Sequence, residues 1–243
     1  MSRLLAFDTA TERMSIALSA AGRVWTHEAD GGAQASAALI PAILGLLAQA
    51  QLSLHELDAI AFGRGPGAFT GLRTACSVAQ GLAFGAGKPV LPIDTLLVVA
   101  EDARATLQAS HLWAVNDARM SEVYAACYAF DGKRWTTRVA PFLTTPALLN
   151  ERWDEAPPEA VAGSALPLFG DQLPSGVAQL APHAAPRADA LLSLAEVAWA
   201  DGLAVDAALA MPLYVRDKVA QTTEEREALR AAKDAAAFAE AAR

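Results

Sequence analysis

Residues 63–73 read Gly-Arg-Gly-Pro-Gly-Ala-Phe-Thr-Gly-Leu-Arg and lie between an apolar run, 59–62, and a helical pattern of small residues, 74–85. Chains present backbone N–H groups to an anion through a strand, a glycine-rich turn and a helix in this order. The spacing differs from that of a Walker loop, which needs Lys-Ser/Thr after its second glycine, and from that of a dinucleotide fingerprint. The stretch predicts an α/β unit, and it leaves open whether a phosphate is bound there.

The first half of the chain predicts one mixed sheet with helices. Short apolar runs alternate with turns and then with helical patterns, which suits an antiparallel meander extended by parallel crossovers. The predicted strands are 4–7, 15–18, 24–27, 59–62 and 90–93; the predicted helices end near Gln51, span 70–86, and run from Asp94 or Thr95 to about Gln108. This order is typical of a ribonuclease-H-like α/β domain.

The second half repeats this order less regularly. Its predicted strands are 111–115, 122–128, 134–136 and 160–162, and its predicted helices are 146–153 and 188–201. Two copies predict an α/β protein with two ribonuclease-H-like lobes, of the actin-like ATPase type, with a cleft between the lobes. We expect domains at 1–107 and 108–216, followed by a charged, Ala-rich tail at 217–243.

Composition restricts the functional classes. The 243 residues carry a net charge of −8, and 53% of them are hydrophobic. This predicts a folded globular protein and argues against tight nucleic-acid binding by the chain alone. The apolar runs are too short to cross a membrane, and Cys76 and Cys127 show no ligand spacing, as expected of reduced thiols in a cytosolic protein. We therefore expect a cytoplasmic protein without membrane contact.

Asp8-Thr9-Ala10 ends the first predicted strand, where a two-lobed ATPase turns around a phosphate. An Asp there can hold a metal-bound water, and Thr hydroxyls can contact phosphate oxygens. With Gly65 and Gly67 of the loop, Asp8 and Thr9 are candidate nucleotide-binding residues. The alternative is that Asp8 and Thr9 satisfy their own turn. Ala10 favours this alternative, because phosphate turns carry Gly where the backbone approaches the ligand.

The helix after the loop has an unusually slim surface. Each internal glycine costs about 1 kcal/mol relative to alanine, so close approach of another helix is expected to offset that cost. The neighbour is either this domain's own first helix or a partner protein, contacted through helices 36–51 and 70–86. The candidate interface residues are Leu39, Ile43, Leu72, Cys76, Ala79, Gly81 and Ala83.

Several catalytic patterns are missing from the sequence. The four histidines form no HExxH or HxxxH pair, and nothing resembles a GxSxG nucleophile elbow. We assign no catalytic residue and no metal ligand. Asp117, Arg119 and Glu122 predict a hairpin with paired charges rather than a catalytic dyad.

The motifs together resemble the TsaB family, also called YeaZ. The matching stretches cover nearly the whole chain except the tail, and they are 5–11, 39–41, 63–73, 80–83, 117–120, 122–124 and 212–216. The GRGPG stretch alone also resembles the paralogous catalytic subunit TsaD. TsaD carries an HxxxH metal-ligand pair after the fifth strand, and the aligned positions here are Asp94 and Val98. Where many TsaB members have His before the Ser/Thr matched by Ser36, this chain has Ala35.

The resemblance implies a non-catalytic role in making threonylcarbamoyladenosine at position 37 of tRNA. The implied partners are TsaD, as a heterodimer through the two helices, the small ATPase TsaE, and tRNA through the complex. It implies no cofactor in the isolated chain, with ATP or ADP bound only at the level of the complex, and the same helices can form a homodimer when TsaD is absent. The alternatives are an active nucleotide-dependent phosphotransferase or ATPase that uses Asp8 and Thr9, and a metalloprotease.

Overall fold

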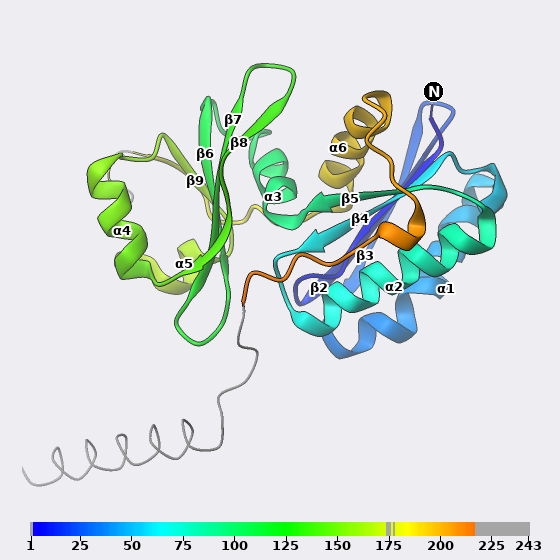
Figure 1. Ribbon diagram of the computed structural model, residues 1–243, viewed down its shortest axis with the longest axis horizontal. Coiled ribbons are helices and arrows are strands. Elements are labelled where there is room, and N and C mark those ends of the chain that lie inside the picture. The colour runs from blue at the N-terminus through cyan, green and yellow to red at the C-terminus, as the bar shows by residue number, and fades with distance from the viewer. Residues whose placement is uncertain (1, 174–175, 177, 217–243) are drawn as a thin grey trace, which may run out of the picture.

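The structure, a computed structural model, describes residues 2–173, 176 and 178–216 and consists of two lobes, each built on a five-stranded sheet (Figure 1). The first sheet has the order β3-β2-β1-β4-β5. Its strands are β1 (Leu4–Asp8), β2 (Arg13–Ala20), β3 (Arg23–Asp30), β4 (Ala59–Gly65) and β5 (Val90–Asp94). Strands β1 to β3 pair antiparallel, whereas β4 and β5 extend the sheet parallel to β1. The ribonuclease-H-like order predicted from the sequence is confirmed.

The second sheet repeats the first, with the order β8-β7-β6-β9-β10. Its strands are β6 (His111–Asp117), β7 (Val123–Phe130), β8 (Trp135–Thr144), β9 (Ala160–Ala162) and β10 (Gln179–Ala181). The predicted pair of α/β lobes is therefore confirmed. Strand β10 and the short helix α5 (Ala165–Phe169) were not predicted, because they lie in an irregular, proline-containing stretch.

Helices cover both faces of the first sheet. Because successive strand residues point to opposite faces, Leu5 and Phe7 pack under α1 (Ala35–Ala50) and α2 (Phe69–Ala86), while Leu4 and Ala6 pack against α6 (Ala188–Ala200). None of the helices in the described part of the chain is long and apolar enough to cross a membrane.

Helix α3 (Thr95–Ala103) lies between the lobes (Figure 1). It was predicted to reach Gln108, but it ends at Ala103 and a turn follows. Leu96 and Val99 pack with the second sheet, whereas Val98 packs with α6. The far face of the second sheet is covered by α4 (Pro146–Glu155).

After the second lobe the chain returns to the first. Helix α6 packs on β1 and β2, and Val205 then pairs with Val90 of β5. Residues 207–216, which we call the strap, run along α2 and end at the second lobe (Figure 1). The predicted domain 108–216 is corrected accordingly: residues 188–210 belong to the first lobe, because their apolar side chains complete its core. The predicted tail, 217–243, lies outside the described residues.

Candidate functional sites: a closed glycine loop and an uncharged helix face

Asp8 ends β1 and is almost fully buried. The N–H of Ala10 donates to its Oδ1 at 2.6 Å, and the hydroxyl of Thr95 donates to its Oδ2 at 2.9 Å. Burial raises the pKa of Asp8 from its ordinary 3.8 to about 6, against the opposing effect of these two hydrogen bonds. Both carboxylate oxygens thus have donors from the chain itself, and Asp8 ties the first residue of α3 to the end of β1.

Thr9 is buried against the start of α2. Its hydroxyl donates to the carbonyl oxygen of Gly71 at 2.7 Å. A Cβ on Gly71 would lie 1.9 Å from the carbonyl oxygen of Thr9, and a Cβ on Gly63 would lie 1.7 Å from Oδ2 of Asp8. These two glycines therefore let the glycine loop and the end of β1 approach closer than any side chain permits.

Gly65 and Gly67 are also used internally. The N–H of Gly65 donates to the Thr95 hydroxyl at 3.1 Å, and the N–H of Ala68 donates to the Ala10 carbonyl at 2.8 Å. A Cβ on Gly67 would lie 2.6 Å from that same carbonyl oxygen. The structure brings the four nucleotide candidates together, but they pack around one another. Ala10 occupies the position at which the backbone of a phosphate-binding turn would approach its ligand.

A cavity of about 580 Å³ lies between the lobes beside this loop, and the β1–β2 and β6–β7 turns line it. An ion pair of 2.6 Å between Arg119 and Glu12 joins the two turns. Arg119 also pairs with Asp117 at 3.2 Å, which confirms the predicted hairpin of paired charges. Neither turn contains glycine. Charged side chains, rather than glycine backbone, therefore line this part of the cleft.

A second cavity of about 460 Å³ lies on the other side of α3, between β5, α6 and the β7–β8 hairpin. Asp94, which aligns with a metal ligand of TsaD, lines it and pairs with Arg64 at 2.5 Å. Val98, at the other aligned position, is fully buried in the core. Within the described residues, no group of three or more His, Cys, Asp and Glu side chains is placed to hold a metal ion.

The predicted interface residues differ in their exposure to solvent. Six of them are at most 5% exposed, and they are Leu39, Ile43, Leu72, Cys76, Ala79 and Ala83. Their prediction as partner contacts is wrong, because they form the rows with which α1 and α2 pack within their own lobe. Gly81 alone is exposed, and a Cβ placed on it would meet nothing within 4 Å. Helical spacing identifies a buried face, but it does not tell which neighbour buries it.

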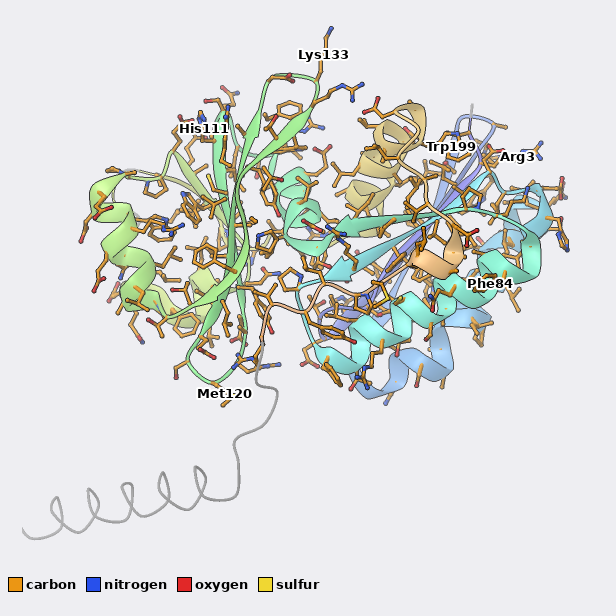
Figure 2. The ribbon with its side chains drawn as sticks, viewed as in Figure 1. Arg3, Phe84, His111, Met120, Lys133 and Trp199 are labelled. Carbon is orange, nitrogen blue, oxygen red and sulfur yellow. The ribbon has the colours of Figure 1, made fainter. Side chains whose placement is uncertain are left out.

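The outer surface of α1 and α2 carries a different set of residues, which we call the helix face. It comprises Ile40, Leu44, Gly45, Ser77, Gly81, Phe84 and Gly85. Ile40, Leu44 and Phe84 are 41%, 50% and 61% exposed (Figure 2 marks Phe84). No charged residue occurs in 35–50 or in 74–87. These exposed apolar residues were not predicted, although the absence of charge in both helices is a signal visible in the sequence.

Comparison with known proteins decides the family. The family of TsaD, tRNA N6-adenosine threonylcarbamoyltransferase, matches residues 26–163. The tRNA threonylcarbamoyladenosine biosynthesis protein TsaB of Escherichia coli K12 is 35% identical over 227 residues, covering 90% of this chain and 96% of that protein. The chain belongs to the TsaB family. The Haemophilus influenzae TsaB is 34% identical over 89% of this chain and 94% of that protein.

A solved TsaB-family structure agrees with the fold. YeaZ from Pseudomonas aeruginosa is 39% identical and superposes with a TM-score of 0.80, covering 88% of this chain and all of that chain. The resemblance drawn from the sequence motifs is thereby confirmed. TsaB proteins are named for threonylcarbamoyladenosine biosynthesis on tRNA, and this chain is a member of that system.

Proposed function

We propose that this TsaB-family protein is a non-catalytic subunit of the complex that makes threonylcarbamoyladenosine at position 37 of tRNA. It binds TsaD through the helix face, works with TsaE, and reaches tRNA through the complex in the cytoplasm. The isolated chain needs no cofactor, and ATP or ADP enters with the complex. The observation that carries the proposal is the contrast between a glycine loop bonded to its own chain and an open, uncharged helix face.

The geometry of the helix face suits a partner helix. Ser77, Gly81 and Gly85 follow one another at intervals of four residues and are all exposed on α2, so a second helix could approach at the lower end of the usual 8–10 Å range. Helices α1 and α2 run in the same direction, each leading into a strand parallel to β1. Ile40 and Leu44 each follow a residue of the buried row of α1 by one position. The right-handed turn of the helix therefore places them on the side that faces α2. A strip of small residues is thus bordered by apolar side chains.

Loss of TsaD binding in Gly81→Leu tests this proposal. A Cβ at this position meets no atom of the described residues within 4 Å, so the fold should be unchanged, while a partner helix over the strip should be displaced. We expect affinity for TsaD, measured by calorimetry, to fall by at least about a hundredfold. Ser193→Leu on α6 is the control, since it places the same leucine side chain on an exposed helix position on the other face of the sheet. Unchanged affinity in Gly81→Leu would overturn the proposed surface.

The nucleotide-dependent phosphotransferase alternative has its own test. Calorimetry of the isolated chain with Mg-ATP should show no binding at concentrations where actin-like ATPases bind. Stoichiometric binding, lost in Asp8→Ala, would favour the alternative, because Asp8 would then be available to a ligand. Metal analysis of the purified chain tests the metalloprotease alternative, which requires stoichiometric zinc.

A further inference from the structure

The strap presents large apolar side chains to solvent. Leu209 and Met211 are 69% and 66% exposed, and Tyr214 is 44% exposed. Their neighbours Ala207 and Ala210 are buried and belong to the core beneath α2. The backbone thus has one side that completes the lobe and one side that carries exposed apolar groups.

The strap is held firmly in place. The side-chain amide of Gln80 donates to the carbonyl oxygens of Ala207 and Ala210, both at 3.2 Å. Further along, Leu213 N–H donates to the Arg64 carbonyl at 2.7 Å. Since these bonds already order the backbone, a partner that covers Leu209 and Met211 pays for side-chain ordering but for little further backbone ordering.

Tyr214 is anchored as well. Its hydroxyl accepts a hydrogen bond from Arg73 at 3.2 Å, and its ring packs on Phe69 with centroids 5.4 Å apart. At its end, Arg216 bonds to Glu122 at 2.5 Å and to the Ala118 carbonyl at 2.8 Å in the second lobe. The strap therefore continues the surface of α2 as far as the cleft between the lobes.

We propose that the strap is the third element of the partner-binding surface, and that the partner on the helix face also covers Leu209 and Met211. This inference rests on the proposed function and adds further residues to the same proposed TsaD-binding surface. Residues 207–215 contain no charge, so they extend the uncharged surface of 35–50 and 74–87, with the exposed Arg73 of α2 bonded to Tyr214 at its edge. The part of the partner that covers it should be apolar as well, because an uncompensated charge there would be desolvated.

The size of the surface supports the same conclusion. Helix α1 has eight exposed positions and α2 has six, whereas a stable interface uses about 20–30 residues on each side. The strap adds four exposed positions next to α2 and brings the surface close to this range. The helix face alone would be a small interface for a lasting complex.

Binding measurements on strap variants of the full chain test the inference. Leu209→Ser and Met211→Ser should each weaken TsaD binding about tenfold, and the double variant about a hundredfold, with unchanged thermal unfolding. Leu203→Ser is the matched control, since Leu203 is 61% exposed but lines the cavity beside α6. It should bind like the wild type.

The outcomes separate the two proposals. If the double variant binds TsaD normally while Gly81→Leu does not, the strap lies outside the interface and only this inference is overturned. If Gly81→Leu also binds TsaD normally, the helix face is not the TsaD-binding surface, and the proposed function is overturned in that part. If the strap variants change only self-association, measured by light scattering, a second copy of the chain covers the strap and the inference is again wrong.

Discussion

Glycines in two regions of the first lobe have opposite surroundings. In the glycine loop and at the start of α2, a Cβ on Gly63 or Gly71 would collide with Asp8 or Thr9. On the helix face, a Cβ on Gly45, Gly81 or Gly85 would meet nothing. The first region is closed, because its glycines bring parts of one chain into contact. The second is open, and among the described residues its glycines have no neighbour that explains them.

This difference separates glycines that the fold requires to be small from glycines that the fold does not explain. The loop's glycines allow its close approach to the end of β1, and the N–H groups of Gly65 and Ala68 bond to Thr95 and Ala10. The glycines of the helix face lower the stability of their helices, and no close contact among the described residues compensates for this loss. A cost of this kind is best offset by a partner, which is why the open region carries the proposed function.

The largest effect is expected from Gly71→Ala. The new Cβ would overlap the Thr9 carbonyl, so the end of β1 and the start of α2 would have to separate. We expect a loss of about 3 kcal/mol or more in the free energy of unfolding, measured with urea. Gly81→Ala in the same helix is the control. A fully stable Gly71→Ala variant would show that the loop is not closed as described.

The pH dependence of stability tests the burial of Asp8. Because folding raises its pKa from 3.8 to about 6, the folded state favours the neutral acid. The associated stability is fully present below pH 3.8 and is lost as the pH rises through 6. Raising the pH from 5 to 7.5 should therefore cost on the order of 1 kcal/mol through Asp8. Asp8→Asn should lack this component, and equal pH profiles for variant and wild type would refute the assignment.

Filling the open glycines should stabilise the isolated chain. Gly81→Ala and Gly85→Ala each remove backbone freedom from the unfolded state at positions with room for a methyl group. We expect a gain of about 0.5–1 kcal/mol for each, seen as a higher urea midpoint with an unchanged slope. Destabilisation would mean that these positions are constrained within the chain itself.

The smallest effect is expected at the ion pair between the lobes. Arg119 and Glu12 are both largely exposed, with side chains 70% and 77% accessible. Arg119→Ala should change the free energy of unfolding by less than about 1 kcal/mol. A much larger loss would show that this pair, rather than the packing of α3 against α6, holds the lobes together.

The sequence predicted most of the fold, because alternation and helical spacing are local signals. All five strands of the first sheet and four of the second were predicted in the right sequence order, including one as short as β9, whereas β10 was missed. The return of α6 to the first lobe was missed, since the contact of Leu191 with the first sheet joins residues far apart in the chain. No local pattern shows on which sheet a late helix packs.

The sites were predicted less well. Asp8 ends β1 and accepts a hydrogen bond from Ala10 of its own turn, as the alternative predicted, whereas the Thr9 hydroxyl bonds to Gly71 at the start of α2 instead. Six of the seven candidate interface residues on α1 and α2 proved to be buried. Leu39 was chosen for its spacing, yet the exposed surface is carried by neighbours such as Ile40 and Phe84. Only three-dimensional packing separates the two rows.

Reconstitution of tRNA modification with TsaD and TsaE tests the central claim most directly. The predicted result is that modification requires this chain, that Asp8→Asn supports it wherever the variant folds and binds TsaD, and that Gly81→Leu does not support it. Loss of modification in an Asp8→Asn protein that is folded and bound to TsaD would contradict the account. Asp8 would then act in the chemistry, and the closed glycine loop would be a working part of the site.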